Sequence, residues 1–192
     1  MLAIFVAVIL SIVGVSVMVS RQMEKAFVSN FSVSSQAQLE RMESFVNVFF
    51  EDAMGNVNLV ASSPLVRRNV TNLTSYADTK EAYKPIGENL SGVEHLIFKE
   101  LERITKAFPA YALTYVGGEN GGFVQAPDDM LSAGYNPPTR PWYIDSLRAG
   151  KPLITEAYIS DNGEAVCTVA TPITAMDGNM RGVAAFDISL SA

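Results

Sequence analysis

The sequence predicts an α+β fold in which a long N-terminal helix is followed by an antiparallel sheet with flanking helices. Three observations support this fold class. Apolar residues recur every three or four positions within residues 21–66, as they do on one face of a helix. Short segments of β-type composition follow from residue 111 onward. The turn sequences Asp161-Asn162-Gly163 and Asp177-Gly178-Asn179 separate these segments and favour antiparallel hairpins.

The first element, residues 1–20, contains no charged side chain. Twenty helical residues span about 30 Å, the thickness of a bilayer's hydrocarbon core, so we expect a transmembrane helix. A cleavable signal peptide is the alternative, but no basic residue precedes the apolar segment and Val17–Ser20 is a poor cleavage site. Arg21 and Lys25 follow the span, whereas the positive-inside rule alone would place them in the cytoplasm. A basic leader preceding Met1 in the natural protein would explain this arrangement.

Residues 21–66 are expected to form a stalk helix that continues from the membrane span. Pro64 marks its expected end, because proline interrupts a helical pattern. Its apolar stripe consists of Met42, Phe45, Phe49, Ala53, Val57 and Val60. Such a stripe predicts packing into a core or against a second helix, and it suggests a homodimer formed through this helix.

Residues 67–192 are expected to form one ligand-binding module. A polar segment, 67–78, precedes a predicted helix over 79–107. Strands are predicted over 111–116, 123–126, 153–160, 165–174 and 182–189. Between the second and third strands lie a proline-rich loop, 127–138, and a short helix, 140–149, that ends at Gly150.

Composition and missing motifs exclude several classes of function. The net charge of −6 argues against nucleic acid as a partner, because phosphate binding needs a basic surface. His95 and Cys167 are the only histidine and cysteine, so neither a disulfide framework nor a structural zinc site is expected. The sequence contains no Gly-x-Gly-x-x-Gly, Walker or Gly-x-Ser-x-Gly motif. We therefore expect no enzymatic activity, no metal and no cofactor.

The segment YNPPTRPWYID, residues 135–145, is rich in groups that recognise small polar ligands. The planar guanidinium of Arg140 can bind a carboxylate through two parallel hydrogen bonds, and the indole N–H of Trp142 can add a third. Tyr135 and Tyr143 supply hydroxyls and aromatic walls.

Two further residues, Tyr158 and Asp187, lie in predicted strands, and Asp187 interrupts an apolar segment. Its carboxylate lies either at the polar face of the sheet or in the interior, where it would need a cationic partner such as a ligand ammonium. An arginine corner and an aspartate corner together match an α-amino acid. The residues alone leave an equal alternative, in which Trp142 and Tyr143 are core aromatics and Arg140 forms a structural ion pair with Asp187.

The spacing Tyr-x4-Arg-x-Trp-Tyr, followed by Tyr158 and Asp187, resembles the amino-acid-binding motif of double Cache (dCache) sensor domains. These are the extracytoplasmic regions of bacterial methyl-accepting chemotaxis receptors and of some sensor kinases and cyclases. The resemblance extends over the whole chain and implies a membrane-distal, PAS-like Cache module at residues 67–192.

The resemblance also implies roles for individual residues. Arg140 and Trp142 would hold the ligand carboxylate, and Tyr135 would close the pocket. Asp187, helped by Tyr158 and Tyr143, would hold the ammonium. Further candidates for the pocket wall are Tyr111, Tyr115 and Asp145.

The sequence departs from the family pattern at Ser160, where an acidic residue is frequent; Asp161 follows it instead. Because of this departure, the resemblance does not imply which ligand side chain the domain prefers. The family would also continue past Ala192 with a membrane-proximal module, a second membrane helix and a signalling region, so we expect the chain to be a fragment of a longer receptor.

The expected function is therefore that of a periplasmic sensor domain, anchored in the bacterial inner membrane through residues 1–20, that binds an L-amino acid and signals across the membrane. One alternative keeps the sensor domain but replaces the amino acid with a biogenic amine or another small molecule, in a histidine kinase or diguanylate cyclase. A second alternative is a membrane-tethered binding or structural protein without signalling output.

Overall fold

The computed structural model describes the backbone of residues 1–160 and 163–190, and the side chains of these residues except 2, 3, 5–9, 26 and 28. Part of the predicted turn at 161–163, including Asp161, therefore lies outside the described residues. The chain divides into two compact units, Met1–Phe49 and Phe50–Ala192.

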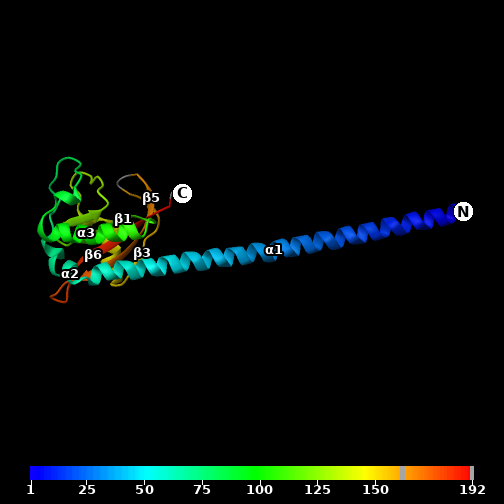
Figure 1. Ribbon diagram of the computed structural model, residues 1–192, viewed down its shortest axis with the longest axis horizontal. Helices are drawn as coiled ribbons and strands as arrows, with labels where there is room; N and C mark the ends of the chain where they lie inside the picture. Colours follow the sequence, from blue (N-terminus) through cyan, green and yellow to red (C-terminus); the bar gives the residue numbers. More distant parts are fainter. Residues whose placement is uncertain (161–162, 191–192) are drawn as a thin grey trace. The chain divides into compact units, whose positions relative to one another are not determined.

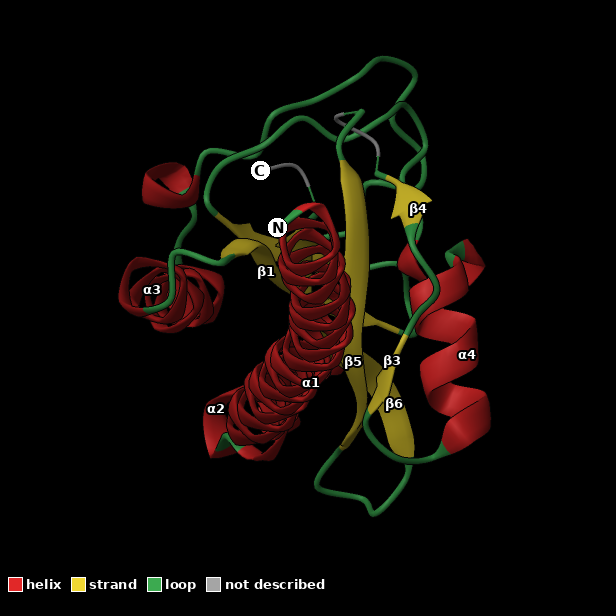
Figure 2. Ribbon diagram, turned by 90° about the vertical axis from the view of Figure 1, so that its right-hand side faces the viewer, coloured by secondary structure: helices red, strands yellow, loops and turns green. Residues whose placement is uncertain are grey.

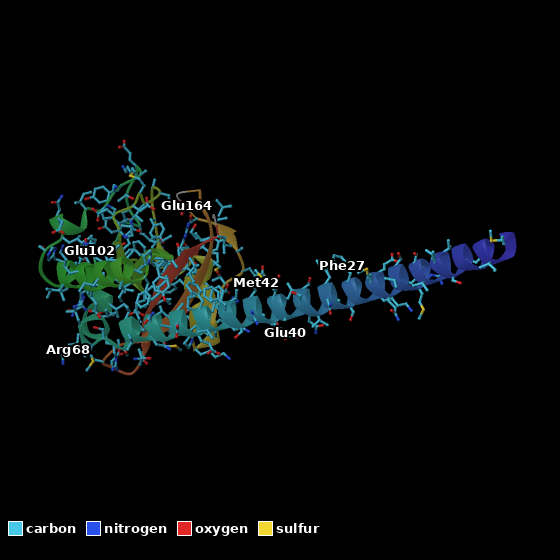
Figure 3. All side chains as sticks on the ribbon, turned by 45° about the vertical axis from the view of Figure 1, so that its right-hand side comes forward. Phe27, Glu40, Met42, Arg68, Glu102 and Glu164 are labelled. Atoms are coloured by element: carbon cyan, nitrogen blue, oxygen red, sulfur yellow. The ribbon has the colours of Figure 1, made fainter. Side chains whose placement is uncertain are left out.

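The first unit is formed by part of a single helix, α1 (Leu2–Ser62). Its described apolar side chains are largely exposed, as Figure 3 shows for Phe27 and Met42, whose exposed fractions are 73% and 65%. In the portion of the chain with described side chains, no helix combines the length and apolar character needed to cross a bilayer. The predicted span, 1–20, includes side chains outside that portion and stays a prediction.

The second unit begins with the C-terminal part of α1, where Ala53, Val57 and Val60 are buried. The predicted helix over 21–66 ends earlier than expected, at Ser62, and a separate helix α2 (Pro64–Asn69) follows. Pro64 lies in the first turn of α2, where its missing N–H leaves no hydrogen bond unmade. The proline therefore starts a helix here as well as marking the end of one.

The predicted helix over 79–107 is wrong in its first half, because α3 spans only Gly92–Ala107. The residues before it form two short 3-10 helices, η1 (Val70–Asn72) and η2 (Gly87–Asn89), joined by irregular chain. Pro85 removes a backbone donor, and Gly87 passes so close to the Phe98 ring that a side chain at residue 87 would clash with it.

The strands form an antiparallel sheet, and the predicted α+β class is confirmed. In the described part of the chain the strand order is β2 (Phe123–Ala126), β1 (Tyr111–Gly118), β6 (Met180–Ser189), β5 (Ala165–Thr174) and β3 (Leu153–Ile154). β4 (Tyr158–Ile159) also pairs with β5, so the single strand predicted over 153–160 is divided in two. Figure 1 shows β6, the last strand in the chain, lying in the body of the sheet beside β1.

Helices cover both faces of this sheet. Figure 2 shows α3 and α4 (Pro141–Ala149) on opposite sides of it. The end of α1 lies on the same face as α3, where Asn56 donates a hydrogen bond to the hydroxyl of Tyr111 and Thr171 donates one to Asn58. The face that α4 covers carries the site described below. Gly150 ends α4 in the left-handed conformation, with φ of 64°, as its position predicted.

One irregularity in β1 decides which side chains reach that face. Tyr111 lies opposite Ile188 and Leu113 lies opposite Asp187, so β1 contains one extra residue in this register. A bulge of this kind reverses the alternation of side chains across the sheet. Tyr111 consequently points to the face that carries α1 and α3, where its ring stacks on Phe186 at 5.0 Å.

Candidate ligand-binding site

A cavity of about 40 Å³ lies on the face of the sheet that α4 covers. The strands, the loop at 127–138 and the start of α4 all contribute side chains to its wall. Its lining residues are Ala112, Leu113, Tyr115, Gln125, Asp129, Met130, Leu131, Tyr135, Arg140, Trp142, Tyr158, Ser160, Glu164, Val166 and Asp187. The lining thus contains five of the six principal residues that the sequence indicated, together with Tyr115.

The carboxylate of Asp187 forms the acidic corner of the cavity. Asp187 lies in the central strand β6, opposite Leu113 of β1 and Thr168 of β5, and only 5% of it is exposed. Its Oδ1 accepts hydrogen bonds from the hydroxyls of Tyr115, at 2.7 Å, and Thr168, at 2.6 Å. The hydroxyl of Tyr158 lies 2.8 Å from Thr168 Oγ1 and 3.5 Å from the same carboxylate oxygen.

Burial raises the pKa of Asp187 above that of an exposed aspartate. The hydrogen bonds from its three hydroxyl neighbours and the positive charge of Arg140 oppose this effect. Burial and the Asp187 charge together raise the pKa of Tyr158 to about 12, and burial raises the pKa of Tyr115 well above its usual value. Both tyrosines are therefore neutral hydrogen-bond donors at physiological pH.

Arg140 provides the basic corner. It is the residue before α4, and its guanidinium carbon lies 5.1 Å from the centre of the Tyr135 ring, within range of a cation–π interaction. Trp142, in the first turn of α4, is 2% exposed and meets Tyr115 edge-on at 4.9 Å. Tyr135 packs in turn against Phe123 of β2 at 4.7 Å. An aromatic wall thus joins the basic corner to the acidic one.

The loop at 127–138 closes one side of the cavity through Leu131. This residue is 3% exposed and exchanges two backbone hydrogen bonds with Tyr83, at 2.8 and 3.0 Å. The ring of Tyr83 stacks on Tyr76, which belongs to the same buried core cluster as Tyr115. The cavity loop is therefore fixed to the segment that precedes α3.

Three candidates from the sequence lie outside the cavity lining. Tyr111 is on the opposite face because of the bulge described above. Tyr143, a residue of α4, is buried in the core, where it meets Trp142 edge-on at 5.6 Å and burial raises its pKa to about 12. Asp145 points outward from α4 and pairs with Arg148 at 2.9 Å, with 46% of its side chain exposed.

The interpretation of Arg140 and Asp187 as a structural ion pair receives no support from the geometry. Among the described residues, the hydrogen bonds of the Asp187 carboxylate come from hydroxyls and none comes from the Arg140 guanidinium. The two charged groups instead line one cavity from different elements, β6 and the start of α4.

In residues 1–160 and 163–190, no cluster of histidine, cysteine or acidic side chains is placed to hold a metal ion.

Sequence reasoning missed several residues of the site, of which Thr168 is the most notable. Threonine is common in strands, and nothing local distinguishes this one. Its position directly opposite Asp187 depends on the pairing of β5 with β6. The polar lining residues Gln125, Asp129 and Glu164 were missed as well. Glu164, labelled in Figure 3, directly precedes β5.

Comparison with known proteins finds similarity to methyl-accepting chemotaxis proteins. Residues 86–192 match the family described as methyl-accepting chemotaxis protein-like, first PDC sensor domain. The chain is 38% identical over 81 residues to the methyl-accepting chemotaxis protein McpA of Pseudomonas putida, and 41% identical over 81 residues to McpB of Bacillus subtilis. These matches cover 42% and 41% of this chain but only 13% and 12% of the two relatives.

A solved structure shares the fold over most of the chain. It is the ligand-binding domain of the amino acid chemoreceptor PctC of Pseudomonas aeruginosa in complex with GABA, with a TM-score of 0.57 and 27% identity. The match covers 77% of this chain and 58% of that domain. The chain therefore spans a small part of the curated relatives and about half of this solved domain.

Proposed function

Because the chain belongs to the family of methyl-accepting chemotaxis protein-like first PDC sensor domains, we propose that it is the periplasmic ligand-binding part of a bacterial transmembrane chemoreceptor and that it binds an L-amino acid. Proteins of this family are non-enzymatic signalling proteins, in agreement with the absence of catalytic motifs from the sequence.

The single observation that carries the proposed ligand is the presence of Arg140 and Asp187 in the lining of one cavity. An α-amino acid carries a carboxylate and an ammonium that complement these two groups. In the proposed complex, Arg140 and Trp142 bind the carboxylate, Asp187 and Tyr158 bind the ammonium, and Tyr135 closes the cavity. Tyr143 then acts by supporting Trp142. GABA, bound by the related domain of PctC, also carries one carboxylate and one ammonium.

The proposed signal is a shift in population between two arrangements of the cavity loop and sheet. A ligand can shift this equilibrium only as far as its affinities for the two states differ. Asn56 and Asn58 of α1 bind the sheet through Tyr111 and Thr171, so a change in the sheet would reach α1. Residues 1–20 would carry the change across the inner membrane, and the exposed Met42 and Phe45 would support a homodimer through α1.

A thermal-shift screen of the whole chain in detergent tests the proposal. Each of the twenty proteinogenic L-amino acids, GABA and several biogenic amines is added separately, and the binders are expected to raise the Tm by mass action. An amino acid should give the largest rise, because only a ligand with both charged groups engages both corners. A larger rise with an amine would favour the alternative ligand class. A folded protein that responds to no compound would contradict the proposed function.

Ligand affinity is also expected to fall in acid. The ammonium binds the ionised form of Asp187, and burial raises the pKa of this carboxyl. Affinity should therefore be full above that pKa and be lost as the pH falls through it, at a higher pH than an exposed aspartate would give. Calorimetric titrations between about pH 4 and pH 8 measure this profile. An affinity that is constant across this range would remove Asp187 from the ammonium site.

A further inference from the structure

We infer that Thr168 is a positioning residue of the ligand site, which orients the Asp187 carboxylate so that Oδ1 is held by the protein and Oδ2 is presented to the ligand. The inference rests on the proposed function, since it concerns the acceptor for the ligand ammonium. Thr168 is fully buried in β5 and does not itself line the cavity. It would therefore act on the ligand only through Asp187.

The geometry of the hydrogen bonds carries the inference. Every hydrogen bond that the described residues make to the Asp187 carboxylate ends on Oδ1, and the shortest, at 2.6 Å, comes from Thr168. Since Thr168 lies directly opposite Asp187 in the pairing of β5 with β6, the backbone register fixes this contact. The hydroxyl groups thus hold one carboxylate oxygen and set the direction of the other.

Counting the hydroxyl protons around Asp187 shows which groups donate hydrogen bonds and which accept them. A threonine hydroxyl has one proton, and an ionised carboxylate only accepts, so the proton of Thr168 goes to Asp187. Tyr158 has one proton and two acceptors in reach, Thr168 Oγ1 at 2.8 Å and Asp187 Oδ1 at 3.5 Å. Because the Thr168 proton is already used, the Tyr158 proton goes chiefly to the closer threonine oxygen. The Tyr158 proton is thereby used within the protein. Oδ2 of Asp187 and the lone pairs of Tyr158 remain as acceptors, which suits an ammonium that only donates.

The variant Thr168→Val tests the inference, because valine keeps the shape of threonine and removes its hydroxyl. The Kd for the amino acid that gives the largest thermal shift is expected to rise about tenfold, since a hydrogen bond to a charged group is lost. Thr168→Ser, which restores the hydroxyl, should recover most of the affinity. The measurement is isothermal titration calorimetry on the whole chain in detergent.

Thr171→Val is the matched control. Thr171 lies three residues farther along β5, is 3% exposed, and donates one hydrogen bond to Asn58 on the opposite face of the sheet. Its substitution removes a comparable buried hydrogen bond without touching Asp187. Both valine variants should lower the Tm by similar amounts, whereas only Thr168→Val should weaken binding. Equal binding by both variants would overturn the inference.

The dependence of affinity on pH separates a positioning role from a merely structural one. The hydrogen bond from Thr168 lowers the pKa of Asp187, so its loss should move the acid limb of the affinity profile to higher pH. Tyr115 of β1, Tyr158 of β4 and Arg140 before α4 face Asp187, and Asp129 and Glu164 line the same cavity. The Cys167 thiol of β5 also interacts electrostatically with Asp187. All of them are retained in Thr168→Val and in Thr171→Val.

The outcomes also separate this inference from the proposed function. A wild-type chain that binds, together with a Thr168→Val variant that binds equally well and has an unchanged pH profile, would overturn the inference and leave the proposed function standing. A folded wild-type chain that responds to none of the compounds in the screen would contradict both.

Discussion

Arg140→Ala is expected to weaken the binding of amino acids by about a hundredfold, while the binding of an amine without a carboxylate changes little. Removing one partner of a hydrogen-bonded charge pair costs about 2–5 kcal/mol, and about 3 kcal/mol corresponds to a hundredfold rise in Kd. Titration of the whole chain with the amino acid selected by the screen and with its decarboxylated amine measures the difference. A parallel loss for both ligands would show that Arg140 acts on the cavity as a whole.

Arg148→Ala is the control for this experiment. Arg148 is also an arginine of the α4 region, but it is exposed and pairs with Asp145 rather than lining the cavity. Its loss should leave both affinities unchanged. Arg140→Lys should give an intermediate loss, because lysine keeps the charge without the planar pair of donors. Unaltered amino-acid binding by Arg140→Ala would move the carboxylate site away from this corner.

Asp187→Ala gives the complementary result. It should weaken the binding of both the amino acid and the amine, because both carry the ammonium. Together, the two variants assign each charged group of the ligand to one corner of the cavity. If both variants bound normally, the site would be wrong even though the family assignment stands.

Phe186→Ala is expected to have the largest effect on stability. Phe186 is fully buried in β6, one residue before Asp187, and lies on the opposite face of the sheet, where it stacks on Tyr111. Truncating a buried phenylalanine removes apolar contacts and leaves a cavity, at a cost of about 3–5 kcal/mol. For a chain of this length the Tm should fall by roughly 10 °C, measured by circular dichroism.

The control is Phe108→Ala, which removes the other phenylalanine ring that stacks on Tyr111. Phe108 stacks on Tyr111 at 5.2 Å but is 42% exposed, so its loss should lower the Tm far less. If Phe186→Ala does not fold, Phe186→Leu, which retains most of the apolar volume, should fold with a smaller fall in Tm. Equal falls in Tm for the alanine variants at 108 and 186 would contradict the assignment of Phe186 to the main core.

Local sequence patterns predicted the architecture well. The strands at 123–126 and 165–174 and the end of α4 at Gly150 agree with the structure to the residue, because turn sequences and changes in periodicity are local signals. The helix predicted over 79–107 failed for a related reason. The prediction relied on the spacing of apolar residues and ignored Pro85 and the glycines at 87 and 92. Proline and glycine end or prevent a helix, and α3 begins only at Gly92.

The sequence likewise indicated some residues of the candidate site and missed others. The composition of residues 135–145, with Tyr158 and Asp187, indicated the charged and aromatic groups that line the cavity. Tyr111 and Thr168 could not be assigned from local patterns. A strand presents alternate residues to alternate faces, so Tyr111 would share a face with Tyr115 unless a bulge intervenes, and the bulge exists only in the pairing with β6.

The sequence by itself thus determined the α+β class and the chemical groups available to a ligand. The tertiary structure alone decided which of those groups meet. Asp187 and Thr168 are nineteen residues apart, and Tyr115 is seventy-two residues from Asp187, yet their hydroxyl and carboxylate groups are within hydrogen-bonding distance. Contacts over such separations follow from strand register, which is fixed by the packing of the whole sheet rather than by any local pattern.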